Sequence, residues 1–125
     1  MFGWKQRDKS VAASKDDAEI ERLNAGLSLA MEWGSNWLKP IQERLAAQYP
    51  ELTVAELDRY NEVCREAMKA GHDLVYSMAE SQGKEVDSAA WQAAFLSRYA
   101  WPNKDNLSKL FSQGMYYAWK DGVGR

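Results

Sequence analysis

Apolar residues recur at intervals of three and four along most of this chain, which is the spacing of one face of an α-helix. The longest such run stays in phase for about seven turns. It comprises Ile20, Leu23, Leu27, Met31, Gly34, Leu38, Ile41 and Leu45. β-branched residues are few and nowhere alternate with polar residues over a useful length, so the sequence gives no indication of strands. We therefore expect an all-α fold.

The first helix is predicted to begin near Ser14, whose spacing from Asp17 is that of a capping box. Two features interrupt the apolar pattern that follows: the sequence 34–36 (GSN) and Pro40, which lacks a backbone N–H. If two separate helices were present, their apolar residues would not be expected to continue one helical pattern without a shift. We therefore favour a single bent helix to about Gln48, with a kink near residues 36–40.

Capping signals mark three further helices. Thr53 and Glu56 form a capping box at the start of a helix to about residue 81, and Asp87 and Asn103 cap the next two. In the second helix, Ala67 and Gly71 predict the close approach of another helix, with the first helix as the expected antiparallel neighbour. The expected fold is a small four-helix antiparallel bundle built on a long helical hairpin, with up to five helices if the first breaks near residues 34–40. Residues 1–13 are expected to form an N-terminal tail and residues 14–125 a single domain.

Composition limits the class of protein. The 125 residues carry a net charge of -2, which argues against a protein whose main role is to coat nucleic acid. A lone Cys64 excludes an intrachain disulfide, and no stretch has the apolar length of a signal peptide or a membrane span. We therefore predict a cytoplasmic protein.

Charge is unevenly distributed along the chain. Residues 1–15 carry four basic and one acidic group, residues 16–97 carry seven and fifteen, and residues 98–125 carry five and two. Basic ends thus flank an acidic middle, and we expect them to pair with it inside the fold.

Catalytic and metal sites have little support in the sequence. Cys64 and His72 lie eight residues apart on one predicted helix, about 12 Å along its axis, so they cannot act as a pair. The carboxylates of Asp58, Glu62 and Glu66 are interleaved with basic residues, as on a solvated, salt-bridged helix face. We predict no catalytic, cofactor-binding or metal-binding residue, and a protein that is not an enzyme.

The best lead to function is a second apolar face on the first predicted helix. At about 100° per residue from Leu27, Leu29 falls near about 200°, Trp33 near about 240° and Trp37 near about 280°, away from the main apolar stripe. These side chains must be covered within the bundle or by another chain. Trp and Tyr dominate binding hot spots, so we predict contact with a protein partner or a second copy through Leu29, Trp33, Trp37, Trp101 and Tyr116.

Two binding alternatives stay open, and an enzyme built on carboxylates alone is a third and least favoured hypothesis. Lys109, Ser112, Tyr116 and Lys120 lie along one line of the last helix and suit the backbone and bases of single-stranded nucleic acid. Phe2 and Trp4, followed by basic residues, resemble a weak peripheral membrane anchor. The alternative function is therefore a peripheral binder of nucleic acid or of a membrane surface, acting through the basic N- and C-terminal segments.

Overall fold

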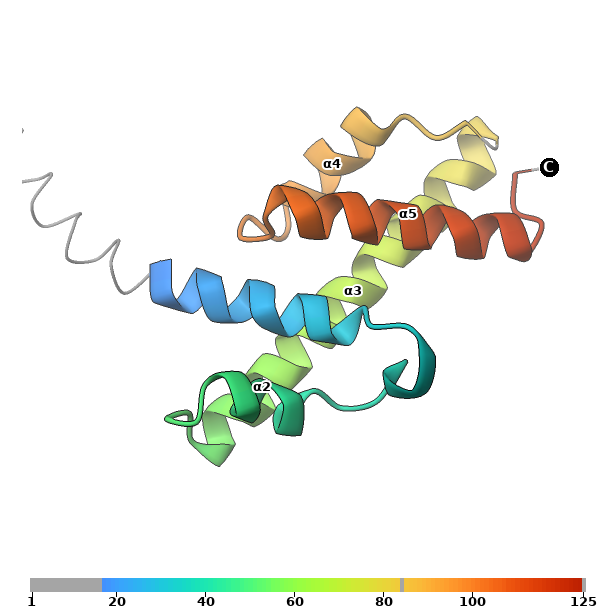
Figure 1. Cartoon of the computed structure of the whole chain (residues 1–125). Coiled ribbons are helices and arrows are strands. Elements are labelled where there is room, and N and C mark those ends of the chain that lie inside the picture. The colour runs from blue at the N-terminus through green and yellow to red at the C-terminus, as the bar shows by residue number, and fades with distance from the viewer. Residues whose placement is uncertain (1–16, 84, 125) are drawn as a thin grey trace, which may run out of the picture.

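The computed structural model describes residues 17–83 and 85–124, and in these residues the chain is helical without any strand. The expected tail (1–13), the Ser14 cap, Phe2 and Trp4 lie outside them. A first helix occupies residues 17–30. It is followed by the short 3-10 helix η1 (Gly34–Asn36), α2 (Gln42–Gln48), α3 (Val54–Gln82), α4 (Ser88–Leu96) and α5 (Lys104–Lys120). The all-α fold is thus confirmed, in its five-helix form (Figure 1).

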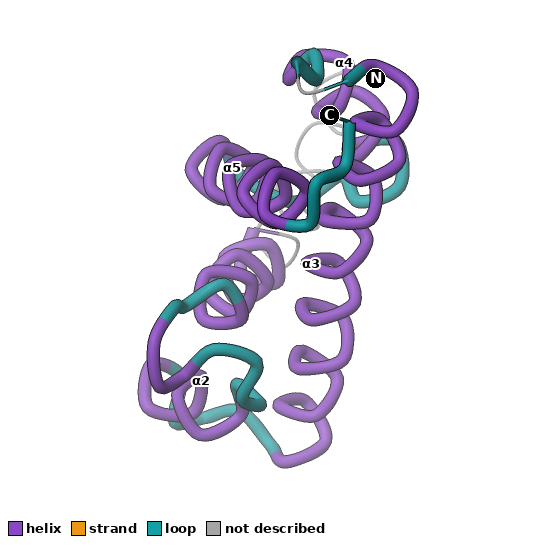
Figure 2. Tube along the Cα trace, turned by 90° about the vertical axis from the view of Figure 1, so that its right-hand side faces the viewer, coloured by secondary structure: helices purple, strands orange, loops and turns teal. Residues whose placement is uncertain are grey.

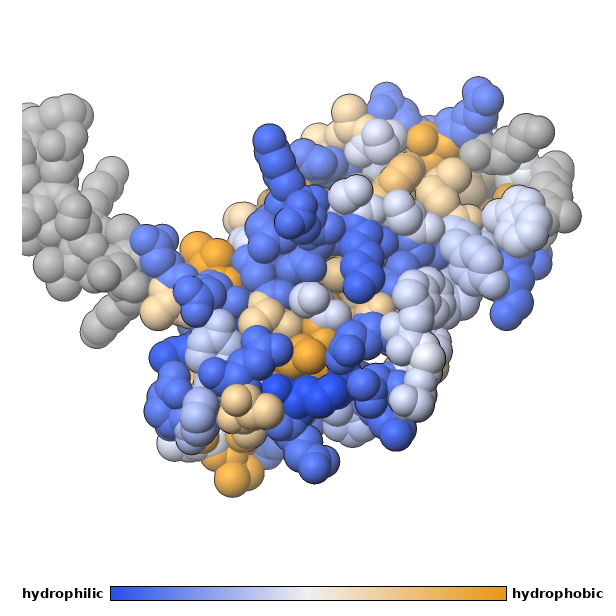
Figure 3. Space-filling view, in the orientation of Figure 1, coloured by the Kyte–Doolittle hydropathy of each residue, from blue (hydrophilic) through white to orange (hydrophobic). Residues whose placement is uncertain are grey.

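The long helix α3 is the element on which the others pack, and α2 and α5 lie along the same side of it (Figure 2). The residues that it buries include Tyr60, Cys64 and Val75. Trp91 of α4 is also buried, and its indole Nε1 donates to the carbonyl oxygen of Gly71 at 3.1 Å. On the face drawn in Figure 3, hydrophilic side chains predominate and hydrophobic ones appear in small separate areas. No helix in the described part of the chain is long and apolar enough to cross a membrane.

The predicted helix starts are confirmed by their capping hydrogen bonds. Thr53 and Glu56 form the reciprocal capping box at the start of α3. The Asp87 carboxylate accepts from the backbone N–H groups of Ala89 and Ala90 in the first turn of α4, and the Asn103 side chain accepts from the Asn106 backbone at the start of α5. Each cap pairs backbone N–H groups that have no partner inside the helix.

The favoured single helix to Gln48 is wrong, because the first helix ends at residue 30 and the chain turns before α2. Gly34 has φ 79° and Leu38 has φ 66°, both in the left-handed region, which a continuous right-handed helix cannot contain. Pro40 adds a position without a backbone donor. Most large residues of the stripe, including Ile41, are still buried, whereas Ile20 is 39% and Leu38 is 55% exposed.

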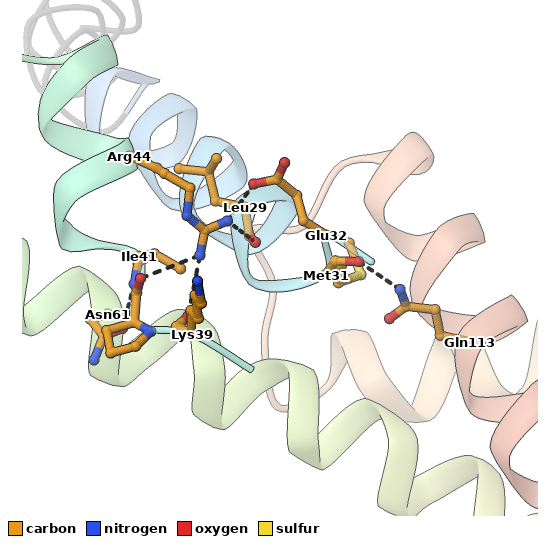
Figure 4. Close-up of polar contacts among 9 residues, drawn as sticks. Leu29, Met31, Glu32, Lys39, Ile41, Arg44, Asn61 and Gln113 are labelled. Atoms are coloured by element: carbon orange, nitrogen blue, oxygen red, sulfur yellow. Dashed lines mark hydrogen bonds and ion pairs between the residues drawn. The ribbon is translucent and has the colours of Figure 1, made fainter. Parts of the chain in front are cut away.

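Side chains form hydrogen bonds with backbone N–H and carbonyl groups between the first helix and α2 (Figure 4). The Arg44 guanidinium donates to the carbonyl oxygen of Leu29 at 2.9 Å and to those of Lys39 and Pro40 at 3.2 and 3.3 Å. It also forms an ion pair with Glu32. One side chain thus links the end of the first helix to the residues just before α2.

Glycines allow the helices to approach α3 closely. A Cβ atom at Gly26 would lie 2.6 Å from the Cys64 sulfur, and one at Gly71 would lie 2.5 Å from Leu110 Cδ2. The close approach predicted at Gly71 is therefore confirmed, but the neighbour there is α5 rather than the first helix. The first helix meets α3 near Cys64, whose thiol donates to the carbonyl oxygen of Leu23 at 3.3 Å.

Candidate functional site

The turn after the first helix brings two tryptophans together. Trp33 precedes η1 and Trp37 follows it, with the Trp37 backbone N–H bonded to the carbonyl oxygen of Gly34 at 3.1 Å. Their rings are stacked, with centroids 4.9 Å apart and planes 29° apart. The angles calculated for a continuous helix do not apply here, because η1 sets the relation between the two rings.

The C-terminal half of α5 adds three more rings. Trp37 stacks on Tyr117 with centroids 5.9 Å and planes 18° apart, and Trp33 meets Tyr116 edge-on at 5.9 Å. Trp119 lies 6.2 Å from Tyr116. These separations are those at which aromatic pairs attract each other. We call this set the aromatic surface: Trp33, Trp37, Tyr116, Tyr117 and Trp119.

Two hydrogen bonds join Met31, Gln113 and His72, next to the aromatic surface. Gln113 is 3% exposed, and its Nε2 donates to the carbonyl oxygen of Met31 at 2.7 Å. Its Oε1 therefore remains to accept from His72 Nε2, 3.2 Å away, which assigns that nitrogen as the protonated one. The His72 ring lies 5.7 Å from Tyr117 and 6.4 Å from Trp37. Burial lowers the pKa of His72, so the ring beneath the aromatic surface is neutral at pH 7.

Tyr76 of α3 fixes the far end of α5. Its hydroxyl donates to the Asp121 carboxylate, and the carbonyl oxygen of Tyr117 lies 3.2 Å from the same hydroxyl oxygen. The bond to Asp121 is the main reason that the pKa of Tyr76 is raised to about 12. The backbone that carries the C-terminal rings is thus tied to α3.

Three residues of the aromatic surface are about half exposed or more: Trp33 at 49%, Tyr116 at 47% and Trp119 at 62%. Trp37 and Tyr117 are partly buried beneath them. Tyr116 and Trp119 also line a groove of about 680 Å³ with Ser112 and Met115. On the other side, Trp37 and His72 line a second groove of about 490 Å³, which includes Glu62 and Arg65. The aromatic surface therefore joins two concave regions.

The five predicted contact residues do not form one site. Trp33, Trp37 and Tyr116 come together, whereas Leu29 and Trp101 are partly buried against the core. The Leu29 carbonyl accepts from Arg44, and the Trp101 carbonyl accepts from Asn24 near the start of α5.

Sequence reasoning missed Tyr117, Trp119 and His72. Tyr117 and Trp119 flank the apolar stripe of α5 and were visible as a Tyr-Tyr-Ala-Trp run at residues 116–119. The contact of Tyr117 with Trp33 depends on how α5 lies beside the turn.

The reactive groups of the described chain lie elsewhere. Burial raises the pKa of Cys64 to about 12, so its thiol is not an activated nucleophile. Asp58, Glu62 and Glu66 are exposed, and within residues 17–83 and 85–124 no group of three or more His, Cys, Asp or Glu side chains is arranged to hold a metal ion. What the aromatic surface offers is shape, apolar area and ring hydrogen-bond donors.

We had expected the basic C-terminal segment to form ion pairs with the acidic middle of the chain. The ion pairs of the described residues do not make this connection. All four link residues between Glu19 and Asp73. The lysines of α5 are thus left facing solvent without an ion pair in this part of the chain.

Comparison with family models, curated proteins and solved structures finds no match to this chain.

Proposed function

We propose that this protein works by binding another protein through the aromatic surface, as an accessory, adaptor or inhibitor-type protein without catalysis of its own. The observation that carries the proposal is the exposure of Trp33, Tyr116 and Trp119 side by side. Exposed aromatic side chains that touch one another are rare on a lone soluble domain and favour association. A cytoplasmic location is part of this proposal.

The surroundings of these rings support binding with little loss of entropy. Trp33 is held by contacts with Trp37, Tyr116 and Tyr117, so its ring is already ordered before a partner arrives. Trp and Tyr supply most of the energy at many interfaces, and ordered side chains cost less to bury. The partner in this proposal is a different protein or a second copy of the chain.

The test uses Trp33→Ser and Trp33→Ser/Tyr116→Ser variants of the full chain. Val54→Ser is the matched control, because Val54 is 75% exposed at the start of α3, outside the aromatic surface. Sedimentation equilibrium measures self-association, and pull-down from the source cells measures other partners. We expect the wild type and the control to bind, and the aromatic variants to lose binding by about 2 kcal/mol or more, as for a hot spot.

The proposal would be wrong if all variants had the same molar mass in sedimentation equilibrium and captured the same proteins in the pull-down. Circular dichroism of each variant shows that it is folded, so a loss of binding is not mistaken for unfolding.

A second candidate function is binding of single-stranded nucleic acid or an anionic membrane. It is favoured by the exposure of Lys109, Ser112, Tyr116 and Lys120 along α5. Retention of the protein on single-stranded DNA or anionic vesicles at low salt tests it, and elution with buffer alone argues against it.

A further inference from the structure

Two lysines lie along the exposed side of α5 with Tyr116 between them. At about 100° per residue, Lys109, Ser112, Tyr116 and Lys120 fall within a sector of about 80°. The rise of a helix puts Lys109 and Lys120 about 16 Å apart along the axis. All four side chains are exposed. They form a line that an extended segment of another chain can follow.

Two acidic residues lie near the lysines of this line: Asp105 is four residues before Lys109, and Asp121 is next to Lys120. Neither Lys109 nor Lys120 takes part in an ion pair within residues 17–83 and 85–124, where all four pairs lie between Glu19 and Asp73. Asp121, the acidic residue next to Lys120, accepts a hydrogen bond from Tyr76. The lysines are therefore available to carboxylates of a partner.

An apolar groove runs beside the same line. It has a volume of about 680 Å³ and is lined by Ser112, Met115, Tyr116 and Trp119, with Ala79 and Val123 closing it. Ser112 and Tyr116 belong to both the groove and the lysine line. A volume of this size is that of a typical ligand site and accommodates a large apolar side chain.

We infer that this side of α5 binds an acidic peptide segment, whose large apolar side chain enters the groove while its carboxylates meet Lys109 and Lys120. The inference rests on the proposed function and names the chemistry of the partner. The carboxylates give orientation and association rate, and the buried side chain gives most of the affinity.

A short acidic peptide fits this molecule better than a long polyanion does. Residues 16–97 carry seven basic and fifteen acidic groups, and α3 exposes Glu62 and Glu66. A nucleic acid strand that extended beyond α5 would meet this negative charge, whereas a peptide of a few residues would not.

The test measures fluorescence anisotropy of a labelled peptide in which glutamates surround one tryptophan and one leucine. The comparison probes are its lysine counterpart and a labelled oligo-dT strand. The proteins are the full chain, Lys109→Glu/Lys120→Glu and Lys104→Glu. Lys104 is an exposed lysine of the same helix that lines a different groove with Trp91 and Phe111, so it is the matched control.

We expect the acidic peptide to bind, with about tenfold weaker binding to the double variant and no change for Lys104→Glu. Raising salt from about 50 to about 500 mM should weaken binding to the wild type more than to the double variant. The lysine counterpart should not bind.

Failure of the acidic peptide to bind, equal binding to the double variant, or tighter binding of oligo-dT would each overturn the inference. The proposed function has a separate readout, the loss of partners in Trp33→Ser. If Trp33→Ser loses a partner but the acidic peptide does not bind the wild type, the proposed function is retained and only the acidic-peptide inference is wrong.

Discussion

Gln113 of α5 donates a hydrogen bond of 2.7 Å to the carbonyl oxygen of Met31, just beyond the end of the first helix. The same carboxamide accepts from His72 of α3. One buried side chain thus links α5 both to α3 and to the start of the turn after the first helix. The bond to Met31 therefore restrains the start of the turn that carries the two tryptophans.

Replacing Gln113 with leucine should therefore destabilise the fold. The change leaves the Met31 carbonyl and the His72 N–H without partners, and each buried unpaired group costs about 1–3 kcal/mol. Urea unfolding measures the loss, and hydrogen exchange should become faster at Trp37 and Lys39, whose backbone N–H groups are bonded within the turn. Gln92→Leu, on the exposed side of α4, is the control and should change stability by no more than about 0.5 kcal/mol. An unchanged midpoint for Gln113→Leu would show that the bond contributes nothing.

His72 should make stability depend on pH in a known direction. Burial lowers its pKa below the ordinary value of 6.5, so the unfolded chain binds a proton more readily than the folded chain. The contribution of the neutral ring is complete above pH 6.5 and is lost as the pH falls toward the lower pKa of the folded state. His72→Gln keeps an N–H donor for Gln113 but does not titrate.

Urea unfolding of both proteins between about pH 8 and about pH 5 measures this difference. We expect the wild type to lose more stability than His72→Gln over this range. Carboxylates are common to both proteins, so their effect cancels in the comparison. Parallel curves for the two proteins would mean that His72 is not held neutral by its surroundings.

The starts of α3, α4 and α5 were predicted correctly because they depend on neighbours in sequence. The bonds of Thr53 with Glu56 and of Asn103 with Asn106 span three residues, so residue type and spacing are sufficient to find them. The end of the first helix depends on interactions between residues that are further apart in the sequence. Arg44 pairs the carbonyl of Leu29 across fifteen residues, and the apolar phase continues through the turn although the helix does not.

The candidate site was predicted only in part for the same reason. Trp33 and Trp37 were selected because they did not fit the main apolar stripe, and that signal is local. Tyr117 joins them through a ring contact between residues eighty or more positions apart, which depends on the packing of α5 against α3. No spacing rule within one helix reveals such a contact.

Asn24 should be among the most sensitive polar positions of the fold. It is 7% exposed, donates to the Trp101 carbonyl at 2.9 Å and accepts from the Asn103 backbone at 2.8 Å and from Asn106 at 2.9 Å. Asn24→Ala removes these three bonds and the one from Nδ2 to the carbonyl oxygen of Ile20, and we expect a loss of about 2–3 kcal/mol in the free energy of unfolding. Ser28→Ala, an exposed position of the same helix, controls for helix propensity. A loss equal to that of the control would exclude a structural role for this network.

Gly114→Ala tests whether helix packing outweighs helix propensity in α5. In an isolated helix, alanine is more favourable than glycine by about 1 kcal/mol. Here a Cβ atom would lie 2.6 Å from Val75 Cγ2 and 2.9 Å from Val75 Cβ. A valine in a helix has one strongly preferred rotamer, and its Cβ is fixed to the backbone, so α5 must move away from α3. We expect a net destabilisation of about 1–3 kcal/mol, measured by urea unfolding.

The double variant Gly114→Ala/Val75→Ala shows whether this contact is the cause. Val75→Ala alone leaves a cavity, and alanine at residue 114 partly fills it, so the two losses should sum to more than the loss of the double variant. Ser108→Ala, exposed on the same helix, should leave stability within about 0.5 kcal/mol of the wild type. If Gly114→Ala stabilises the protein instead, propensity decides at this position and α5 does not pack as closely on α3 as the distances require.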